Sequence, residues 1–260
     1  MIFKQYSTVV SNKLLTSLVH KNSFDWIPIL TLPSSDSKFQ IEQVDIRQVP
    51  VLSSAVNVVD TARDLGVTID SRLTLADQVA ATCRSTYFQL QQLWLITRSL
   101  SSDAAKAVVH AFILCRLDYC NSLLFGIADD QLQRWQAVYN ATARLVSGAR
   151  RSVHITPVLW QLHWLPVKQR VEYKLAILTY KAGHGLLPLY LAGDCQLVTA
   201  TGRRQLRSSD IPTLVVHRTS TRFGDRCFLC AAARIWNRLP SSLRDPEVTY
   251  GQFCRPLLFA

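Results

Sequence analysis

From residue 75 to residue 98, apolar residues recur at intervals of three and four positions. The run is Val79, Cys83, Tyr87, Leu90 and Trp94. This spacing matches the α-helical period of about 3.6 residues and would place the five side chains on one face, so it predicts a long helix packed against the rest of the protein. A strand would instead need apolar residues at every second position. The segment therefore points to a fold made chiefly of packed helices.

The next two helices are predicted from the same spacing and from residues that favour helix ends. Ser101 or Ser102 can cap a second helix. A third runs from about residue 130 to residue 147, and Gly148 lies just past its end. The apolar stripes expected on the two helices are Ala104, Val108, Ala111 and Cys115, then Leu132, Trp135, Val138, Ala141 and Leu145.

Four shorter helices are expected in the last 110 residues or so of the chain. Pro157 suits the first turn of one, and Pro166 begins another that extends to about residue 182. Between residues 192 and 226 the chain is polar and rich in arginine, which predicts a long loop with one short strand near Val215. Two small helices, over about 227–238 and 251–258, complete this half.

Strand character is confined to the region before the first helix. Alternating apolar residues between residues 41 and 67, such as Val44 with Ile46 and Val56 with Val58, predict two or three short strands. The last strand is expected over residues 65–69, with a glycine at position 66 that permits close backbone approach. The expected fold class is mainly α: a helical bundle and a helical C-terminal region, with a small β element near the N-terminus.

The charge and the cysteine content indicate which class of binding partner and which cellular compartment to expect. The chain has 29 Lys and Arg against 18 Asp and Glu, a net charge of +11, which favours a polyanionic partner. Nucleic acid is the commonest such partner, although an anionic membrane surface would serve equally well on charge alone. No uncharged apolar stretch approaches the roughly 18 residues of a spanning helix, and no signal peptide is recognisable. The odd number of cysteines, seven, fits reduced thiols. We expect a protein of the cytosol or nucleus that neither spans a membrane nor is secreted.

Basic residues are the strongest candidates for a binding role. Two adjacent arginines follow the third helix, two lysines seven positions apart share one face of the helix after Pro166, and three arginines lie close together in the polar loop. The forked guanidinium group of arginine is well shaped to donate hydrogen bonds to phosphate oxygens. The candidate nucleic-acid contacts are Arg150, Arg151, Lys174, Lys181, Arg203, Arg204 and Arg207. The alternative is a solvated basic surface, with Arg222 or Arg226 paired to Asp225.

Zinc binding and histidine-dependent catalysis are disfavoured. Cys227 and Cys230 lie near His217, but a structural zinc site needs four ligands and no second cysteine pair is present, so buried thiols are expected. Histidines occur at positions 154, 163 and 184 without a recognisable serine or cysteine nucleophile beside them. We therefore assign no metal ligand, no catalytic residue, no cofactor and no small-molecule substrate.

Several short blocks, taken in order, resemble a known family. They are Asp60-Thr-Ala-Arg-Asp-Leu-Gly-Val67, Cys115-Arg-Leu-Asp-Tyr-Cys-Asn-Ser-Leu-Leu-Phe-Gly126, His154-Ile-Thr-Pro-Val158, Leu162-His-Trp-Leu-Pro166, Tyr180-Lys-Ala-Gly-His-Gly185, Arg222-Phe-Gly-Asp-Arg226 and Trp236-Asn-Arg-Leu-Pro240. Their order and spacing resemble the last third of the reverse transcriptase of non-LTR (LINE-type, jockey-like) retrotransposons. The resemblance covers roughly residues 42–259.

The resemblance implies a division of the chain. Residues 41–70 would be strands from the end of the palm, 71–148 a thumb-like helical domain, and 149–260 a C-terminal helical and Arg-rich region, while 1–40 match no part of the family. In that family the thumb grips the template–primer duplex. The catalytic palm motifs lie upstream of every block seen here, so the resemblance implies a remnant of an RNA-directed DNA polymerase without its own polymerase activity.

One acidic pair could be mistaken for a catalytic motif. Reverse transcriptases carry a Tyr/Phe-Ala-Asp-Asp box whose carboxylates bind two Mg²⁺ ions on a tight hairpin. Here Asp129 and Asp130 follow a helix that stops at Gly126 and open the next helix, so we expect a cap and first-turn acids stabilised by the helix dipole. The expected function is weak, non-specific binding of RNA or an RNA–DNA hybrid; the alternatives are a helical protein-interaction scaffold and an inert relic.

Overall fold

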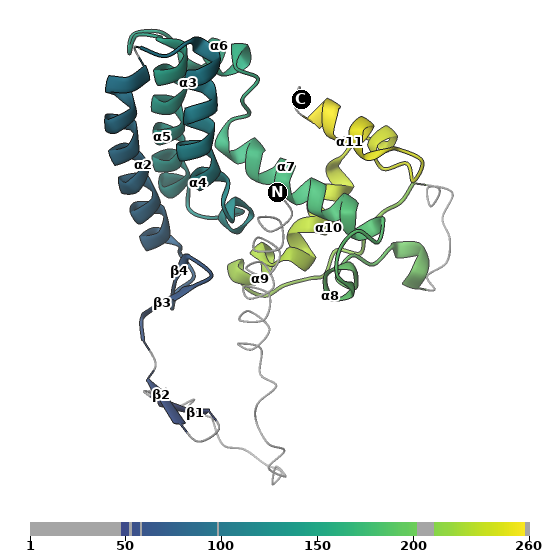
Figure 1. The fold of residues 1–260 in the computed structure, drawn as a ribbon. Helices are drawn as coiled ribbons and strands as arrows, with labels where there is room; N and C mark the ends of the chain where they lie inside the picture. Colours follow the sequence, from purple (N-terminus) through teal and green to yellow (C-terminus); the bar gives the residue numbers. More distant parts are fainter. Residues whose placement is uncertain (1–47, 52–53, 58, 98, 202–210, 258–260) are drawn as a thin grey trace.

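The protein is mainly helical, with a small β element before the first long helix (Figure 1). The computed structural model describes residues 48–51, 54–57, 59–97, 99–201 and 211–257. The expected fold class, mainly α with a little β near the N-terminus, is confirmed for these residues. Val44, Ile46 and Val58, which helped to predict the strands, lie outside them.

The described strands form two antiparallel hairpins. β1 (Gln48–Val51) pairs with β2 (Ser54–Asn57), and β3 (Thr61–Asp64) pairs with β4 (Val67–Asp70). Leu65 and Gly66 have φ values of 45° and 83° and form the two-residue turn between β3 and β4. The prediction that Leu65 and Gly66 begin a strand was wrong: positive φ at both central positions is what a tight hairpin turn requires, and the strand starts at Val67.

The longest helix is α2 (Ala76–Thr97), close to its predicted span. Its buried residues are Val79, Cys83, Thr86, Leu90 and Leu93, whereas Tyr87 and Trp94 are exposed. Placing Tyr87 and Trp94 on the buried face was therefore wrong. Successive residues are about 100° apart around a helix, so positions 86 and 93 continue the face of Val79 and Leu90, and the two aromatic residues fall at its edge.

The second helical stretch is interrupted by a π-helical turn. It consists of α3 (Ser102–Val109), the π-helix η1 (His110–Leu114) and α4 (Cys115–Asp118). Ser101 is the cap, since its side chain accepts a hydrogen bond from the Ala104 amide. The buried stripe is Ala105, Val109, Ile113 and Leu117. The predicted stripe was one position early in α3 and two positions early from the π turn onward; the wider π turn keeps residues four apart on one face, a spacing that a regular α-helix would not maintain.

The third predicted helix is α5 (Asp129–Ser147), which follows the 3₁₀ turn η2 (Asn121–Leu124). Gly148 ends it with a φ of 68°, as expected. Trp135, Val138 and Leu145 are buried on it. Helices α2 and α5 pack side by side along much of their length, and the short helix α6 (Ile155–Gln161) lies at the end farthest from the β3–β4 hairpin (Figure 1).

The C-terminal half is organised around α7 (Val167–Gly183), which packs against α10 (Phe228–Arg238) (Figure 1). The remaining elements are α8 (Leu189–Ala192), the 3₁₀ turn η3 (Val198–Thr201), α9 (Arg222–Arg226), the 3₁₀ turn η4 (Ser241–Leu243) and α11 (Tyr250–Leu257). Both predicted closing helices are present. The strand expected near Val215 is reduced to a single bridge between Leu197 and Leu214.

A continuous apolar cluster joins the two halves. It extends from Val67 through the helices of the bundle to Trp236 and Phe253, whose rings stack with centroids 6.0 Å apart. Trp236 is buried in this core, while Trp164 is half-buried and its ring centroid lies 5.2 Å from that of Tyr139. Within the described parts of the chain, no helix combines the length and apolar character needed to cross a membrane.

Candidate nucleic-acid interface

A hollow of about 720 Å³ lies between α2 and the end of α5. One side is formed by α2 and the other by the last turns of α5 and the chain that follows Gly148. Aromatic and basic side chains both line it: Tyr87, Trp94, Arg144, Arg150 and Arg151. Among the described residues that line the hollow, none carries a carboxylate. The hollow therefore combines positive charge with aromatic surface.

The basic side of the hollow is created by the way α5 ends. Gly148 takes the left-handed conformation and turns the chain out of the helix, which places Arg150 and Arg151 in an exposed loop. A turn closes behind them, with the Val153 amide donating to the Arg150 carbonyl at 3.1 Å. Arg144, one turn before the helix end, donates to the Val153 carbonyl at 3.4 Å. The loop is thus held against the helix while both arginines stay accessible to solvent.

The aromatic side of the hollow was missed by the sequence argument, which placed both rings in the core. Tyr87 is 43% and Trp94 is 52% exposed. They are seven residues apart, so they lie on the same side of α2. The available signal was Leu93, an apolar residue directly before Trp94 that continues the face of Val79 and Leu90.

The two candidate lysines lie on α7 and do not line this hollow. Lys174 and Lys181 are both half-buried. Burial lowers the pKa of Lys174; the nearby carboxylate of Asp118 acts in the opposite direction. Lys181 holds its ammonium 5.2 Å from the centre of the Tyr250 ring. Arg203, Arg204 and Arg207 lie outside the described residues.

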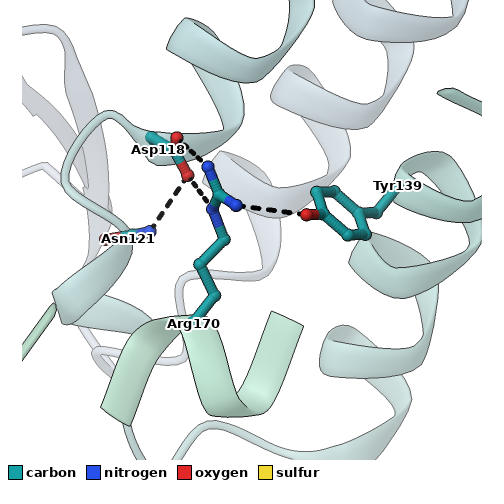
Figure 2. Close-up of polar contacts among 4 residues, drawn as sticks. All are labelled: Asp118, Asn121, Tyr139 and Arg170. Carbon is teal, nitrogen blue, oxygen red and sulfur yellow. Dashed lines mark hydrogen bonds and ion pairs between the residues drawn. The ribbon is translucent and has the colours of Figure 1, made fainter. Parts of the chain in front are cut away.

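An ion pair joins the bundle to the C-terminal half (Figure 2). Arg170, on α7, contacts both carboxylate oxygens of Asp118, which lies at the end of α4. Its other terminal nitrogen donates to the Tyr139 hydroxyl at 3.1 Å, and the Asn121 amide donates to Asp118 at 3.4 Å. Burial opposes the charge on Arg170, but the Asp118 carboxylate outweighs it and raises the pKa of Arg170. The charge of Arg170 is therefore used within this junction between the bundle and the C-terminal half.

Burial also governs the ionisation of Tyr139 in the same network. It raises the pKa of Tyr139 to about 12, against the opposing effect of the Arg170 charge. The hydroxyl therefore stays protonated at neutral pH and can accept the hydrogen bond from Arg170. The residues of the junction come from positions 118, 121, 139 and 170, so sequence spacing offered no signal for their meeting.

Other residues of the sequence blocks tie distant backbone segments together. The Tyr119 hydroxyl donates to the Leu65 carbonyl in the β3–β4 turn. Arg226 donates to the Leu73 carbonyl at 2.8 Å and to the Phe125 carbonyl at 3.1 Å. Asn237 donates to the Leu214 carbonyl and accepts from the Leu214 amide, each at 2.9 Å. These blocks serve to hold the architecture.

The alternative of a solvated basic surface paired Asp225 with Arg222 or Arg226, and that pairing was wrong. Asp225 instead contacts Arg234 on α10 and accepts from the Thr219 hydroxyl. Arg222 is exposed, and Arg226 points toward the carbonyls described above. The short helix α9 sets these directions, because it turns neighbouring side chains away from one another.

The acidic pair lies at the start of a helix. Asp129 and Asp130 are exposed in the first turn of α5, as expected. The expectation that one of them caps the helix was wrong: Ala128 occupies the cap position, and no side chain there accepts a hydrogen bond. The acids therefore act on the helix through its dipole alone.

The cysteine pair is buried, as expected for apolar thiols. Cys227 and Cys230 are both in the core, and the Cys230 thiol donates to the His217 carbonyl at 3.7 Å. Burial raises the pKa of Cys230 to about 12, which keeps the thiol protonated. Among the described residues, no three His, Cys, Asp or Glu side chains are arranged to hold a metal ion.

The three histidines that belong to the sequence blocks, His154, His163 and His184, occupy helix ends. His154 precedes α6 without a capping hydrogen bond from its side chain, and His163 follows α6 with a φ of 55°. His184 ends α7, where its ring stacks on Tyr180 at 3.8 Å and Nδ1 lies 2.8 Å from the Tyr180 carbonyl.

No protein-family model, curated protein or solved structure matches this chain. The resemblance to reverse transcriptases therefore depends on the sequence blocks themselves. Any function must be argued from those blocks and from the hollow between α2 and α5.

Proposed function

We propose that the chain is the end-of-palm, thumb and C-terminal part of a non-LTR retrotransposon reverse transcriptase and binds RNA or an RNA–DNA hybrid through the phosphate backbone. The binding is weak and independent of sequence. We do not propose polymerase activity. The only two adjacent aspartates in the region that resembles the family are Asp129 and Asp130, and both lie in the first turn of α5. A pair of metal-binding carboxylates would instead need a hairpin and a third acid.

The observation that carries the proposal is the placement of Arg150 and Arg151. Both are exposed beside a hollow whose described lining has no carboxylate to neutralise them. Guanidinium groups bind phosphate oxygens with two parallel hydrogen bonds, which suits a nucleic-acid backbone. Lys174 and Lys181 would contribute less, because both are half-buried on α7.

The arrangement of the first elements supports the same proposal. The β3–β4 hairpin runs directly into α2, and α2 packs on α5 to form a helical bundle. This order is the one that the resemblance implies for the end of the palm and the thumb. The detail differs, since Leu65 and Gly66 form a turn here and do not lie within a strand.

A titration of the full chain with a fluorescently labelled RNA–DNA hybrid at two salt concentrations tests the proposal. Each phosphate contact should contribute roughly 0.7–0.9 to the slope of log affinity against log salt. Arg150→Ala/Arg151→Ala should lower that slope by about 1.5. The triple variant of Arg203, Arg204 and Arg207 should weaken binding uniformly across sequences.

A matched control removes the same charge elsewhere. Arg63→Ala/Arg72→Ala affects two exposed arginines at the hairpin end of α2 and should leave most of the slope intact. Equal losses from both double variants would mean that only net charge matters. Binding by the unaltered chain that does not respond to salt would contradict the proposal.

A protein-interaction scaffold is the second candidate, and exposed apolar residues favour it. On α2, Leu95 is 77% exposed and Phe88 is also exposed, and Phe112 is exposed on the π-helical turn. Such residues in a bundle suit contact with another protein. This function predicts a partner whose affinity changes little with salt, so the same titration separates the two candidates.

A further inference from the structure

We infer that the hollow between α2 and α5 binds unpaired nucleotides, with bases stacked on Tyr87 and Trp94 and their phosphates on Arg150 and Arg151. The inference rests on the proposed function and specifies its ligand: a single-stranded segment of RNA or DNA in preference to a continuous duplex. The site would consist of the exposed rings of α2 and the exposed arginines that follow α5, which line the same hollow of about 720 Å³.

The spacing of the rings suits a short stack. Tyr87 and Trp94 are two turns apart on α2, which corresponds to roughly 10 Å along the helix axis. Stacked nucleotides advance about 3.4 Å each along one strand, so the distance matches about three nucleotides. Leu90 and Gln91 lie between the two rings in sequence and also line the hollow, so the surface between the rings is partly apolar and partly polar.

The arginines supply the other half of such a site. Arg150 and Arg151 follow the end of α5, and Arg144 lies on the last turns of the same helix. A strand whose bases face α2 would therefore direct its phosphates toward α5 and its loop. Stacking of bases on aromatic rings beside a basic groove is the common means of binding single strands without sequence preference.

A paired duplex fits this hollow less well. Within a duplex each base is covered on both faces by its neighbours, so Tyr87 and Trp94 could reach only a base that is unstacked. An acidic peptide would satisfy the arginines, but it would leave the two rings without a flat partner. A ligand that carries phosphates and planar bases at regular spacing would use both surfaces together.

The test compares two labelled single strands of equal length, one with bases and one made entirely of abasic nucleotides. Both carry the same phosphate charge, so their affinity ratio reports base contacts alone. The full-length chain should bind the base-bearing strand about tenfold more tightly. Trp94→Ala should bring this ratio close to one, Tyr87→Ala should reduce it, and Trp94→Phe should retain most of it. Arg150→Ala/Arg151→Ala should weaken binding of both strands by a similar factor and leave the ratio high.

Trp160→Ala is the matched control. Trp160 is 75% exposed on α6 and does not line the hollow, so its loss should leave the ratio unchanged. Circular dichroism of each variant verifies that the helices are intact, which is expected because the substituted rings are exposed. Trp94→Phe offers a second test that conserves a stacking ring.

The outcomes separate the inference from the proposed function. Salt-dependent binding with a ratio near one in the unaltered chain, or a ratio that survives Trp94→Ala, would overturn the inference and keep backbone binding. No salt-dependent binding of either strand or of the RNA–DNA hybrid would overturn both. Tighter binding of a poly-glutamate peptide than of the base-bearing strand, lost in Arg150→Ala/Arg151→Ala, would overturn the inference in favour of an acidic protein partner.

Discussion

Arginines have opposite roles in two regions of this molecule. At the junction between the bundle and the C-terminal half, Arg170 is bound to Asp118 and Tyr139, and Arg226 donates to the Leu73 and Phe125 carbonyls. At the far end of the bundle, Arg150 and Arg151 are exposed beside a hollow without carboxylates in its described lining. Charge on the junction stabilises the fold, whereas charge at the hollow is available to a ligand.

The difference comes from the groups that face each side chain. Arg170 is half-buried, and a guanidinium removed from water must find acceptors, which Asp118 and Tyr139 provide. Arg150 and Arg151 keep their water and need no internal acceptor. Substitutions in the two regions should therefore separate stability from binding.

The largest effect is expected from Asp118→Ala. It would leave the Arg170 guanidinium partly buried without its carboxylate, and we expect the free energy of unfolding to fall by about 2 kcal/mol. This is below the value for fully buried pairs, because the Arg170 and Asp118 side chains are 24% and 32% exposed. Urea unfolding measured by circular dichroism would show the change, while the salt slope of hybrid binding should stay the same.

Asp103→Ala provides the control for Asp118→Ala. Asp103 forms an exposed pair with Lys106 at 3.4 Å, and losing it should cost less than about 0.5 kcal/mol. Equal urea midpoints for the two variants would show that the junction pair contributes no more than a surface pair, and the contrast between the two regions would fail.

Arg226→Ala should have the next largest effect. Its loss removes two donors, one to the Leu73 carbonyl and one to the Phe125 carbonyl, and should cost about 1–2 kcal/mol of stability. Thermal unfolding would detect this as a lower midpoint. Arg222→Ala, in the same helix but exposed, should leave the midpoint nearly unchanged; a similar loss in both would indicate that α9 itself depends on its charge.

The smallest effect, expected from Asp70→Asn, depends on pH. Burial acts to raise the pKa of Asp70, but hydrogen bonds from the Thr74 and Leu75 amides, the Thr74 hydroxyl and the Arg72 amide outweigh it, so the pKa is lowered. A lowered pKa in the folded state stabilises the protein above the ordinary value and loses this contribution as pH falls through the folded value. At pH 7 the substitution should cost about 1 kcal/mol.

Urea unfolding of both proteins across pH tests this. The difference in stability between the unaltered chain and Asp70→Asn should be constant above about pH 5 and narrow below about pH 4. Asp60→Asn, an exposed acid just before β3, serves as the control. A difference that widens on acidification would contradict the assignment. Asp70 thus adds to the comparison a charged residue whose carboxylate accepts the hydrogen bonds of the turn that leads into α2.

Local sequence predicted the helices well because their signals are local. Ser101 caps α3, Gly148 ends α5, and the apolar spacing of α2 located that helix to within a residue or two. Caps, glycines and a helical repeat each act within a few positions of the chain, so the mainly α fold class could be predicted. The buried face of α2 was predicted less well than its ends. Tyr87 and Trp94 lie at the edge of the apolar stripe, and packing against α5 decided which residues became buried.

The basic character of the chain and the candidate arginines also came from sequence alone. Only the tertiary structure decided how each cation is used, because partners such as Asp118 and Arg170 are 52 positions apart. In the same way, it was the packing of α2 on α5 that brought Trp94, Arg150 and Arg151 to the lining of one hollow. Sequence thus determined the helices and the excess of positive charge, while long-range packing determined which charges are neutralised and which remain exposed.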